Sequence, residues 1–230
     1  ISEAKASEFD WDAIFEGADW FHFTGITPAL GDDAAELTLQ ALKAAKAKGI
    51  TVSVDLNYRE KLWSQEKAKE VMTELMEYVD VCIGNEEDAD KVFGIRAENT
   101  DISKGEINHE GYEEVAKKII DTFDVKIVAS TLRESYSASD NGWSAILNDG
   151  KKSYLSKKYD LRIVDRVGGG DSFASGLIYG LVMGNPLDEA LEFAVAASAL
   201  KHTIPGDTNH VSKEEVLALV GGDGSGRVQR

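Results

Sequence analysis

The stretch that decides the fold is Asp165-Arg166-Val167-Gly168-Gly169-Gly170-Asp171-Ser172-Phe173-Ala174-Ser175-Gly176. Its three consecutive glycines leave backbone N–H groups uncovered, and the helix predicted behind them directs its positive end at the loop. The sequence therefore predicts a seat for a phosphate or a developing anion at residues 168–170. The carboxylate of Asp171 lies beside this seat and can accept a proton from a hydroxyl nucleophile. The alternative is an ordinary glycine-rich turn from strand to helix, with the aspartate as a cap.

Strands and helices alternate on both sides of this stretch. Periodicity and turn residues predict strands over 20–25, 50–55, 79–84, 125–130 and 161–164. They predict helices over 32–48, 64–78, 85–93, 111–123, 171–183 and 187–202 and from 212 onward, with caps at Asp32 or Asp33 and at Ser64. A hairpin is expected where 143–147 and 152–155 flank Asn148-Asp149-Gly150. The alternation predicts an α/β fold, a mostly parallel sheet with helices on both faces.

Length and composition exclude several classes of protein. The chain has 230 residues and a formal net charge of −16, which argues against a general nucleic-acid surface and against adsorption to anionic membranes. A length of this order allows one large domain, or one domain with an appendage. No apolar run approaches the roughly 18 residues that a membrane helix needs. A single cysteine, Cys82, excludes an internal disulfide and indicates a reducing compartment such as the cytoplasm.

A second candidate site follows the strand predicted at 50–55, in Asp55-Leu56-Asn57-Tyr58-Arg59. The guanidinium of Arg59 can hold a carboxylate or a phosphate through two parallel hydrogen bonds. The alternative is an exposed arginine paired with Asp55 or Glu60, an interaction that contributes little to stability.

The glycine-rich stretch resembles the second signature of the phosphofructokinase-B (ribokinase-like) carbohydrate kinases. Asp165, Gly168, Gly170 and Asp171 match it, while Arg166 stands where most members have Thr. The resemblance extends from near Ile1 to about Leu219, and one branch, the 2-keto-3-deoxygluconate kinases, is also similar in Phe21-His22-Phe23-Thr24-Gly25-Ile26, in Asp55 to Arg59 with Leu62-Trp63-Ser64, and in Ala199 to Asp207.

This resemblance implies ATP-dependent phosphorylation of a sugar acid at its primary hydroxyl, with Mg²⁺ and with a monovalent cation such as K⁺. Asp171 is then the catalytic base, and Gly168, Gly169 and Gly170 donate N–H groups to the transferred phosphoryl group. The resemblance assigns nucleotide contacts to Asn57, Arg59, Ser130, Thr131, Arg133, Gly168, Gly170 and Lys201, and sugar contacts to Arg59, Asp171 and Asp207.

Three of these assignments leave alternatives open. Asn85 and Asp88 are expected either to hold Mg²⁺ through water or only to carry negative charge in the first turn of a helix. Arg133, at the end of the strand predicted over 125–130, is expected either to contact ATP phosphate or to pair with Glu134. His202 is expected near the adenine or at a helix C-terminus.

The resemblance also bears on the limits of the chain. Such kinases begin with strands, a lid and a Gly-Gly motif that this sequence does not contain, and the first residue is Ile1. We therefore expect residues 1–220 to be the larger, C-terminal part of one kinase domain, which binds sugar poorly by itself, with a flexible tail over 221–230. A homo-oligomer is a further expectation. The competing functions are another sugar kinase of the same superfamily, of the fructokinase or ribokinase type, and a non-catalytic nucleotide- or sugar-binding module.

Overall fold

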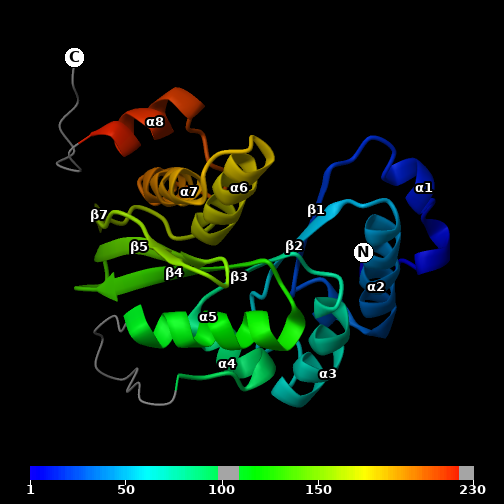
Figure 1. Ribbon diagram of the computed structural model, residues 1–230. Coiled ribbons are helices and arrows are strands. Elements are labelled where there is room, and N and C mark those ends of the chain that lie inside the picture. The colour runs from blue at the N-terminus through cyan, green and yellow to red at the C-terminus, as the bar shows by residue number, and fades with distance from the viewer. Residues whose placement is uncertain (98–108, 223–230) are drawn as a thin grey trace. The chain divides into compact units, whose positions relative to one another are not determined.

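The computed structural model describes residues 1–97 and 109–222, which form two compact units (Figure 1). Among the described residues, unit 1 comprises 1–97, 110–130 and 148–152, and unit 2 comprises 109, 131–147 and 153–222. The expected tail over 221–230 lies outside the described residues from 223 onward. The last helix extends to Gly221, the first residue of that expected tail. No helix in the described ranges is long and apolar enough to cross a membrane.

Unit 1 is built on a parallel sheet in the order β1-β2-β3-β4. Its elements are η1 (Ala6–Glu8), α1 (Trp11–Ile14), β1 (Trp20–Thr24), η2 (Pro28–Leu30), α2 (Asp32–Ala47), β2 (Thr51–Asp55), α3 (Gln65–Met76), β3 (Val81–Gly84), α4 (Glu86–Phe93), α5 (His109–Phe123) and the start of β4 (Ile127–Ser135). Trp20 pairs with Thr51, Ser53 with Val81, and Val81 with Ile127. The predicted strands and helices of this half are confirmed.

The inner strands of unit 1 are buried along their length. Val52, Ser53 and Val54 of β2 are each fully buried, which is the pattern of a parallel strand covered on both faces. The helix caps differ from expectation in one place. Ser64 caps α3 by accepting a hydrogen bond from the N–H of Lys67, as predicted. The predicted cap at Asp32 or Asp33 is wrong, because the backbone turns into α2 at Gly31, where φ is +145°, and both aspartates already lie in the first turn.

Unit 2 contains the antiparallel strands and the last three helices. Its elements are the end of β4, β5 (Asp140–Asn148), β6 (Ser153–Leu155), β7 (Tyr159–Arg162), α6 (Gly169–Val182), α7 (Leu187–Lys201) and α8 (Lys213–Gly221). Strand β5 lies between β4 and β6 and also pairs with β7, where Trp143 is opposite Tyr159. The hairpin predicted at 148–150 is confirmed, with Gly150 at φ +81°. Figure 1 shows α6, α7 and α8 on one side of β4, β5 and β7.

Strand β4 corrects one expectation about the nucleotide site. The strand was expected to end near Ser130, but it continues to Ser135. The extension forms because a short connection links β4 to β5, with the N–H groups of Tyr136 and Ser137 both donating to the carbonyl of Asp140 at 3.0 Å. Ser130, Thr131 and Arg133 are therefore interior residues of β4, and only the first of them belongs to unit 1.

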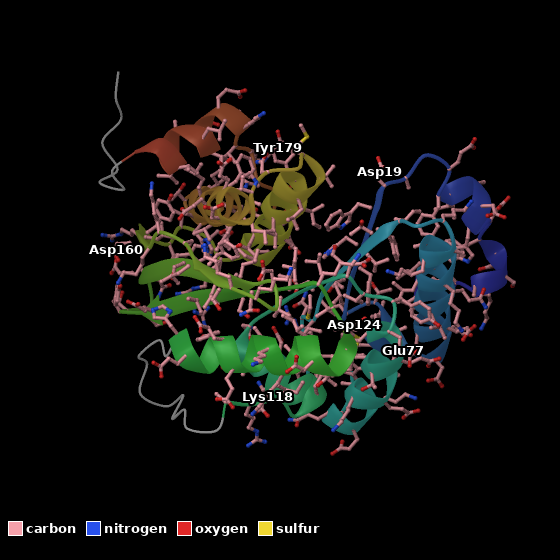
Figure 2. All side chains as sticks on the ribbon, in the orientation of Figure 1. Asp19, Glu77, Lys118, Asp124, Asp160 and Tyr179 are labelled. Atoms are coloured by element: carbon pink, nitrogen blue, oxygen red, sulfur yellow. The ribbon has the colours of Figure 1, made fainter. Side chains whose placement is uncertain are left out.

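Helix α6 is fixed against α7 by close backbone contact. A Cβ on Gly176 would lie 2.8 Å from the Cα of Ala194, and one on Gly180 would lie 2.8 Å from the Cα of Ala190. Glycine at these two positions lets the helices approach more closely than larger side chains would allow. Tyr179, labelled in Figure 2, packs on Phe193 with ring centroids 5.0 Å apart. The helix that begins at the glycine-rich loop is thus anchored along its length.

Candidate active site

The glycine-rich loop ends where α6 begins, and two backbone donors are open there. Gly168 is the N-cap residue at φ +79°, and Gly169 is the first residue of the helix. The N–H of Gly169 donates to the carbonyl oxygen of Arg166 at 3.2 Å, and that of Ser172 donates to Gly168 at 2.9 Å. The N–H groups of Gly170 and Asp171 have no acceptor among the described residues. The N–H of Gly168 has none there either, and its predicted phosphate contact stays a prediction. The donors of Gly170 and Asp171, at the positive end of α6, are suited to bind an anion.

Asp171 is exposed in the first turn of α6. Within the described residues, no hydrogen bond or ion pair engages its carboxylate. An unengaged carboxylate beside open N–H donors can receive a proton from a hydroxyl group held at the same place. This is the arrangement that the sequence predicted for Asp171 as a base, and its catalytic role remains a proposal.

Gly168 and Gly169 lie so close to neighbouring residues that a side chain at either position would clash. A Cβ on Gly168 would overlap the carbonyl oxygen of Asp207 and lie 3.0 Å from its carbonyl carbon. A Cβ on Gly169 would lie 2.7 Å from Cε1 and 2.8 Å from Nε2 of His202. The loop therefore rests directly on the segment that follows α7. Gly169 was predicted to donate its N–H to phosphate; here that N–H donates to the carbonyl of Arg166 and Gly169 packs closely on His202, so the phosphate contact stays a prediction.

Asp165 connects the glycine-rich loop to the segment after α7. One carboxylate oxygen accepts a hydrogen bond from the N–H of Val167 at 3.0 Å, and the other accepts from the N–H of Gly206 at 2.9 Å. These two hydrogen bonds, with the charge of Lys201 as a smaller cause, lower the pKa of Asp165. Through these two hydrogen bonds the ionised carboxylate joins the residue before Gly168 to the residue before Asp207, and so holds Gly168 and Asp207 in contact.

The side chain of His202 packs directly against Gly169. Its side chain is buried, and Nδ1 donates to the carbonyl oxygen of Ser198 at 2.6 Å. The ring packs on Trp143, whose indole N–H donates to the Ser198 hydroxyl at 2.6 Å. The carbonyl of His202 accepts hydrogen bonds from the N–H groups of Val164 and Asp165. His202 is the C-cap residue of α7, which confirms the expected position at a helix C-terminus, and its side chain also packs under the glycine-rich loop.

Positive charge surrounds this loop despite the acidic chain. Burial is the largest cause that lowers the pKa of His202, and the charges of Lys201, Arg166 and Arg133 lower it further, against the opposite effect of the hydrogen bond to Ser198. Arg166 donates to the carbonyl of Ala138 at 2.7 Å. The positive field that acts on His202 also favours an anion at the helix start.

Arg133 is exposed and lies in β4. Its expected alternative, an ion pair with Glu134, does not form, because Glu134 pairs with Lys158 at 3.1 Å and accepts a hydrogen bond from Tyr136. A nucleotide contact by Arg133 stays a prediction, as do those by Ser130 and Thr131. The sugar contact predicted for Asp207 also stays a prediction; its side chain is exposed.

The second candidate site lies within unit 1, after β2. Asn57 adopts a left-handed backbone conformation (φ +40°), which asparagine tolerates better than most residues, and its amide donates to the hydroxyl of Thr24 at 3.2 Å. The guanidinium of Arg59 donates to the carbonyl of Tyr58 at 2.9 Å. No ion pair between Arg59 and Glu60 is observed, and the expected alternative of pairing with Asp55 stays a prediction.

Arg59 borders an open hollow of about 250 Å³, lined by Tyr58, Arg59, Glu60, Lys61 and Lys91. Three of these five residues are cations and one is an anion, so the net charge of the lining is positive. Lys91 also pairs with Glu87 at 3.2 Å. A small ligand with a carboxylate or a phosphate suits a hollow of this size and charge. We call it the Arg59 hollow.

The pair Asn85 and Asp88 forms the cap of α4. The side-chain oxygen of Asn85 accepts from the N–H of Asp88 at 2.9 Å, while the two carboxylate oxygens of Asp88 accept from the N–H groups of Asn85 (3.1 Å) and Tyr58 (3.0 Å). Burial raises the pKa of Asp88, and these hydrogen bonds and the charge of Arg59 oppose it. The contacts are those of a helix cap. No group of three His, Cys, Asp or Glu side chains in the described residues is arranged to hold a metal ion, and a water-mediated role for Asp88 stays a prediction.

Comparison with known proteins identifies the sequence family of the chain. The sequence family described as pfkB family carbohydrate kinase matches residues 1–214. The chain belongs to this family. Among solved structures, the 2-dehydro-3-deoxygluconokinase of Thermotoga maritima is similar, with 50% identity and a TM-score of 0.90 over 96% of this chain and 65% of that one.

Two curated relatives of the pfkB-family chain are similar over nearly its whole length. The 2-dehydro-3-deoxygalactonokinase of Haloferax volcanii is 31% identical over 97% of this chain and 64% of its own length. The 2-dehydro-3-deoxygluconokinase of Bacillus subtilis is 29% identical over 94% of this chain and 60% of its own length. The chain thus spans less than two thirds of the length of these relatives.

Proposed function

We propose that the protein containing this chain transfers the γ-phosphoryl group of ATP to the primary C6 hydroxyl of 2-keto-3-deoxygluconate, giving 2-keto-3-deoxy-6-phosphogluconate and ADP. The observation that carries the proposal is the start of α6, where the unengaged carboxylate of Asp171 lies beside the open N–H groups of Gly170 and Asp171. Phosphoryl transfer needs mainly positioning and charge stabilisation, and such an arrangement supplies both. The pfkB family membership and the names of the similar kinases support the same reaction.

Asp171 is the proposed base. It takes the proton from the sugar hydroxyl as the oxygen attacks the γ-phosphorus and the bond to the β-phosphate oxygen breaks. The N–H groups of Gly170 and Asp171 then bind the equatorial oxygens of the transferred group, where negative charge is spread. The dipole of α6 and the positive field of Lys201, Arg166 and Arg133 act in the same direction.

Arg59 is the proposed partner of the sugar carboxylate, and its contacts support this choice over a neutral sugar. Fructose and ribose carry no carboxylate, whereas the Arg59 hollow has three cations in its lining. The guanidinium donates to a neighbouring carbonyl, and its further N–H donors can bind a carboxylate through two parallel hydrogen bonds.

ATP is proposed to enter as its magnesium complex. Mg²⁺ usually keeps several waters and binds through substrate phosphates, so it does not need a cage of protein ligands. The capping carboxylate of Asp88 is the proposed outer-sphere contact. The cytoplasmic location and a homo-oligomer are further proposals, the first of which rests on the single buried cysteine, Cys82.

The test uses the protein at its full encoded length and a panel of 2-keto-3-deoxygluconate, 2-keto-3-deoxygalactonate, fructose and ribose. Asp171→Asn should lower kcat by a factor of roughly 10²–10⁴ while ATP still binds. Asp188→Asn is the matched control, because Asp188 is an exposed aspartate in the first turn of α7. Equal losses in the two variants would contradict the role of Asp171.

Arg59→Ala should raise KM for the acid sugar by roughly 10–100-fold, the loss of a charge-assisted hydrogen bond of about 1.5–3 kcal/mol. Arg59→Lys should recover only part of this, because lysine lacks the planar fork. A similar loss on fructose or ribose would favour a neutral-sugar kinase. Absence of phosphoryl transfer with every sugar would favour a non-catalytic binding module.

A further inference from the structure

Lys201, the last residue of α7, is a buried cation beside the glycine-rich loop. Its side chain is 0% exposed, and it is the only lysine or arginine among the buried residues of the described ranges. Buried charges are costly unless oxygen atoms compensate them. The ammonium group of Lys201 donates to the carbonyl oxygen of Ile204 at 3.1 Å. A nucleotide contact was predicted for this residue, but its ammonium points into the protein, at the turn after α7.

Two loops carry the negative groups that interact with this ammonium, one through a hydrogen bond and one through charge alone. Ile204 belongs to the turn after α7, and Asp165 belongs to the segment that leads to the glycine-rich loop. The charge of Lys201 contributes to the lowered pKa of Asp165, so the carboxylate lies within its field. Asp165 in turn accepts from the N–H groups of Val167 and Gly206, one on each loop. One buried positive charge therefore stabilises both loops that shape the start of α6.

Carbonyl and carboxylate oxygens of this kind are also the ligands of a monovalent metal ion. K⁺ and an ammonium group carry the same charge, have similar size, and bind the same oxygen atoms. A K⁺ ion at this place would compete with Lys201 for the Ile204 carbonyl, and the two cations would repel each other. The residues around Lys201 thus do not fit a monovalent cation such as K⁺, which the family resemblance implies without giving its site.

We propose that the ammonium of Lys201 is a built-in monovalent cation for the glycine-rich loop, which makes the protein independent of K⁺ there. Lys201 is a positioning residue in this proposal: it acts on the open N–H groups of α6 through Ile204 and Asp165. The kinetic part of the proposal rests on the proposed kinase function, while the part on cation binding does not.

The first experiment compares cations on the unaltered protein at full encoded length. Thermal unfolding and phosphoryl transfer are measured in choline chloride and then in NaCl, KCl or NH₄Cl at constant ionic strength. We expect rates within about 1.5-fold of one another and the same unfolding midpoint in each salt. A rate increase of fivefold or more, or a midpoint several degrees higher, in KCl but not in NaCl would overturn the proposal. If no kinase activity is found, the proposed function fails and the unfolding midpoint still decides this inference.

The second experiment removes the built-in cation. Lys201→Ala leaves a space beside the Ile204 carbonyl, whereas Lys201→Met fills that space without a charge. Lys201→Ala should gain a K⁺- or NH₄⁺-dependent rise in unfolding midpoint, and at least a tenfold loss of kcat that these ions partly restore. Lys201→Met should show a similar loss without restoration. Lys213→Met, at an exposed lysine of α8, should change neither readout. Equal behaviour of Lys201→Ala and Lys201→Met in every salt would contradict the proposal.

Discussion

Gly168→Ala tests the contact between the glycine-rich loop and the turn after α7. Gly168 has φ +79°, and a Cβ there would overlap the carbonyl oxygen of Asp207. Gly184 is a matched position in the same unit: its φ is +73°, and a Cβ would meet nothing within 4 Å. Alanine at either position has the same backbone strain. Only alanine at 168 also displaces a neighbouring backbone.

The expected losses in the free energy of unfolding follow from the backbone strain and from the displacement of Asp207. Left-handed backbone at a residue with a Cβ costs about 1–2 kcal/mol, so Gly184→Ala should lower the free energy of unfolding by that amount. Gly168→Ala adds the displacement of Asp207, whose carbonyl carbon and Cα would be 3.0 and 3.3 Å from the new Cβ. Overpacking of this kind costs about 1–3 kcal/mol, so the total loss should be about 2–5 kcal/mol.

The assay is equilibrium urea unfolding of the wild-type protein and both variants, with the m-values compared to verify that the same transition is observed. Phosphoryl transfer should fall sharply in Gly168→Ala, because the movement of Asp207 also disturbs the hydrogen bond between Gly206 and Asp165. It should be retained in Gly184→Ala. A free energy of unfolding for Gly168→Ala within about 0.5 kcal/mol of that for Gly184→Ala would refute the contact described here.

Three other features give measurable outcomes. Asp88→Ala should lower the free energy of unfolding by about 2 kcal/mol, because the N–H groups of Tyr58 and Asn85 lose their acceptor, whereas Glu87→Ala, at an exposed ion pair, should change it by less than about 1 kcal/mol. The pKa of His202 is lowered in the folded state, so the unfolded chain binds a proton more readily than the folded one. The contribution of His202 to the free energy of unfolding should therefore be full above about pH 6.5 and be lost as the pH falls through the lowered pKa. His202→Gln should flatten this dependence, and parallel pH curves for the two proteins would count against it. Burial raises the pKa of the Cys82 thiol, so it should react with thiol reagents only after unfolding, and rapid labelling of the folded protein would contradict its place in the core.

Local patterns were sufficient for most of the secondary structure. Ser64 and Ser212 begin α3 and α8 as their side chains predict, since a helix cap is made by residues only three positions apart. The turn at Gly150 also follows from adjacent residues. The length of β4 could not be predicted from local patterns, because residues 131–135 are held by pairing with β5. Local propensity carries no information about such pairing.

The sequence by itself determined that a glycine-capped helix begins beside Asp171, because glycine conformation and helix direction are properties of neighbouring residues. Only the tertiary structure decided that Gly168 and Gly169 make room for Asp207 and His202. It also decided that Lys201 is buried where its charge acts on Asp165. These outcomes depend on contacts between segments more than thirty residues apart, and the packing of α7 against α6 is what brings those segments together.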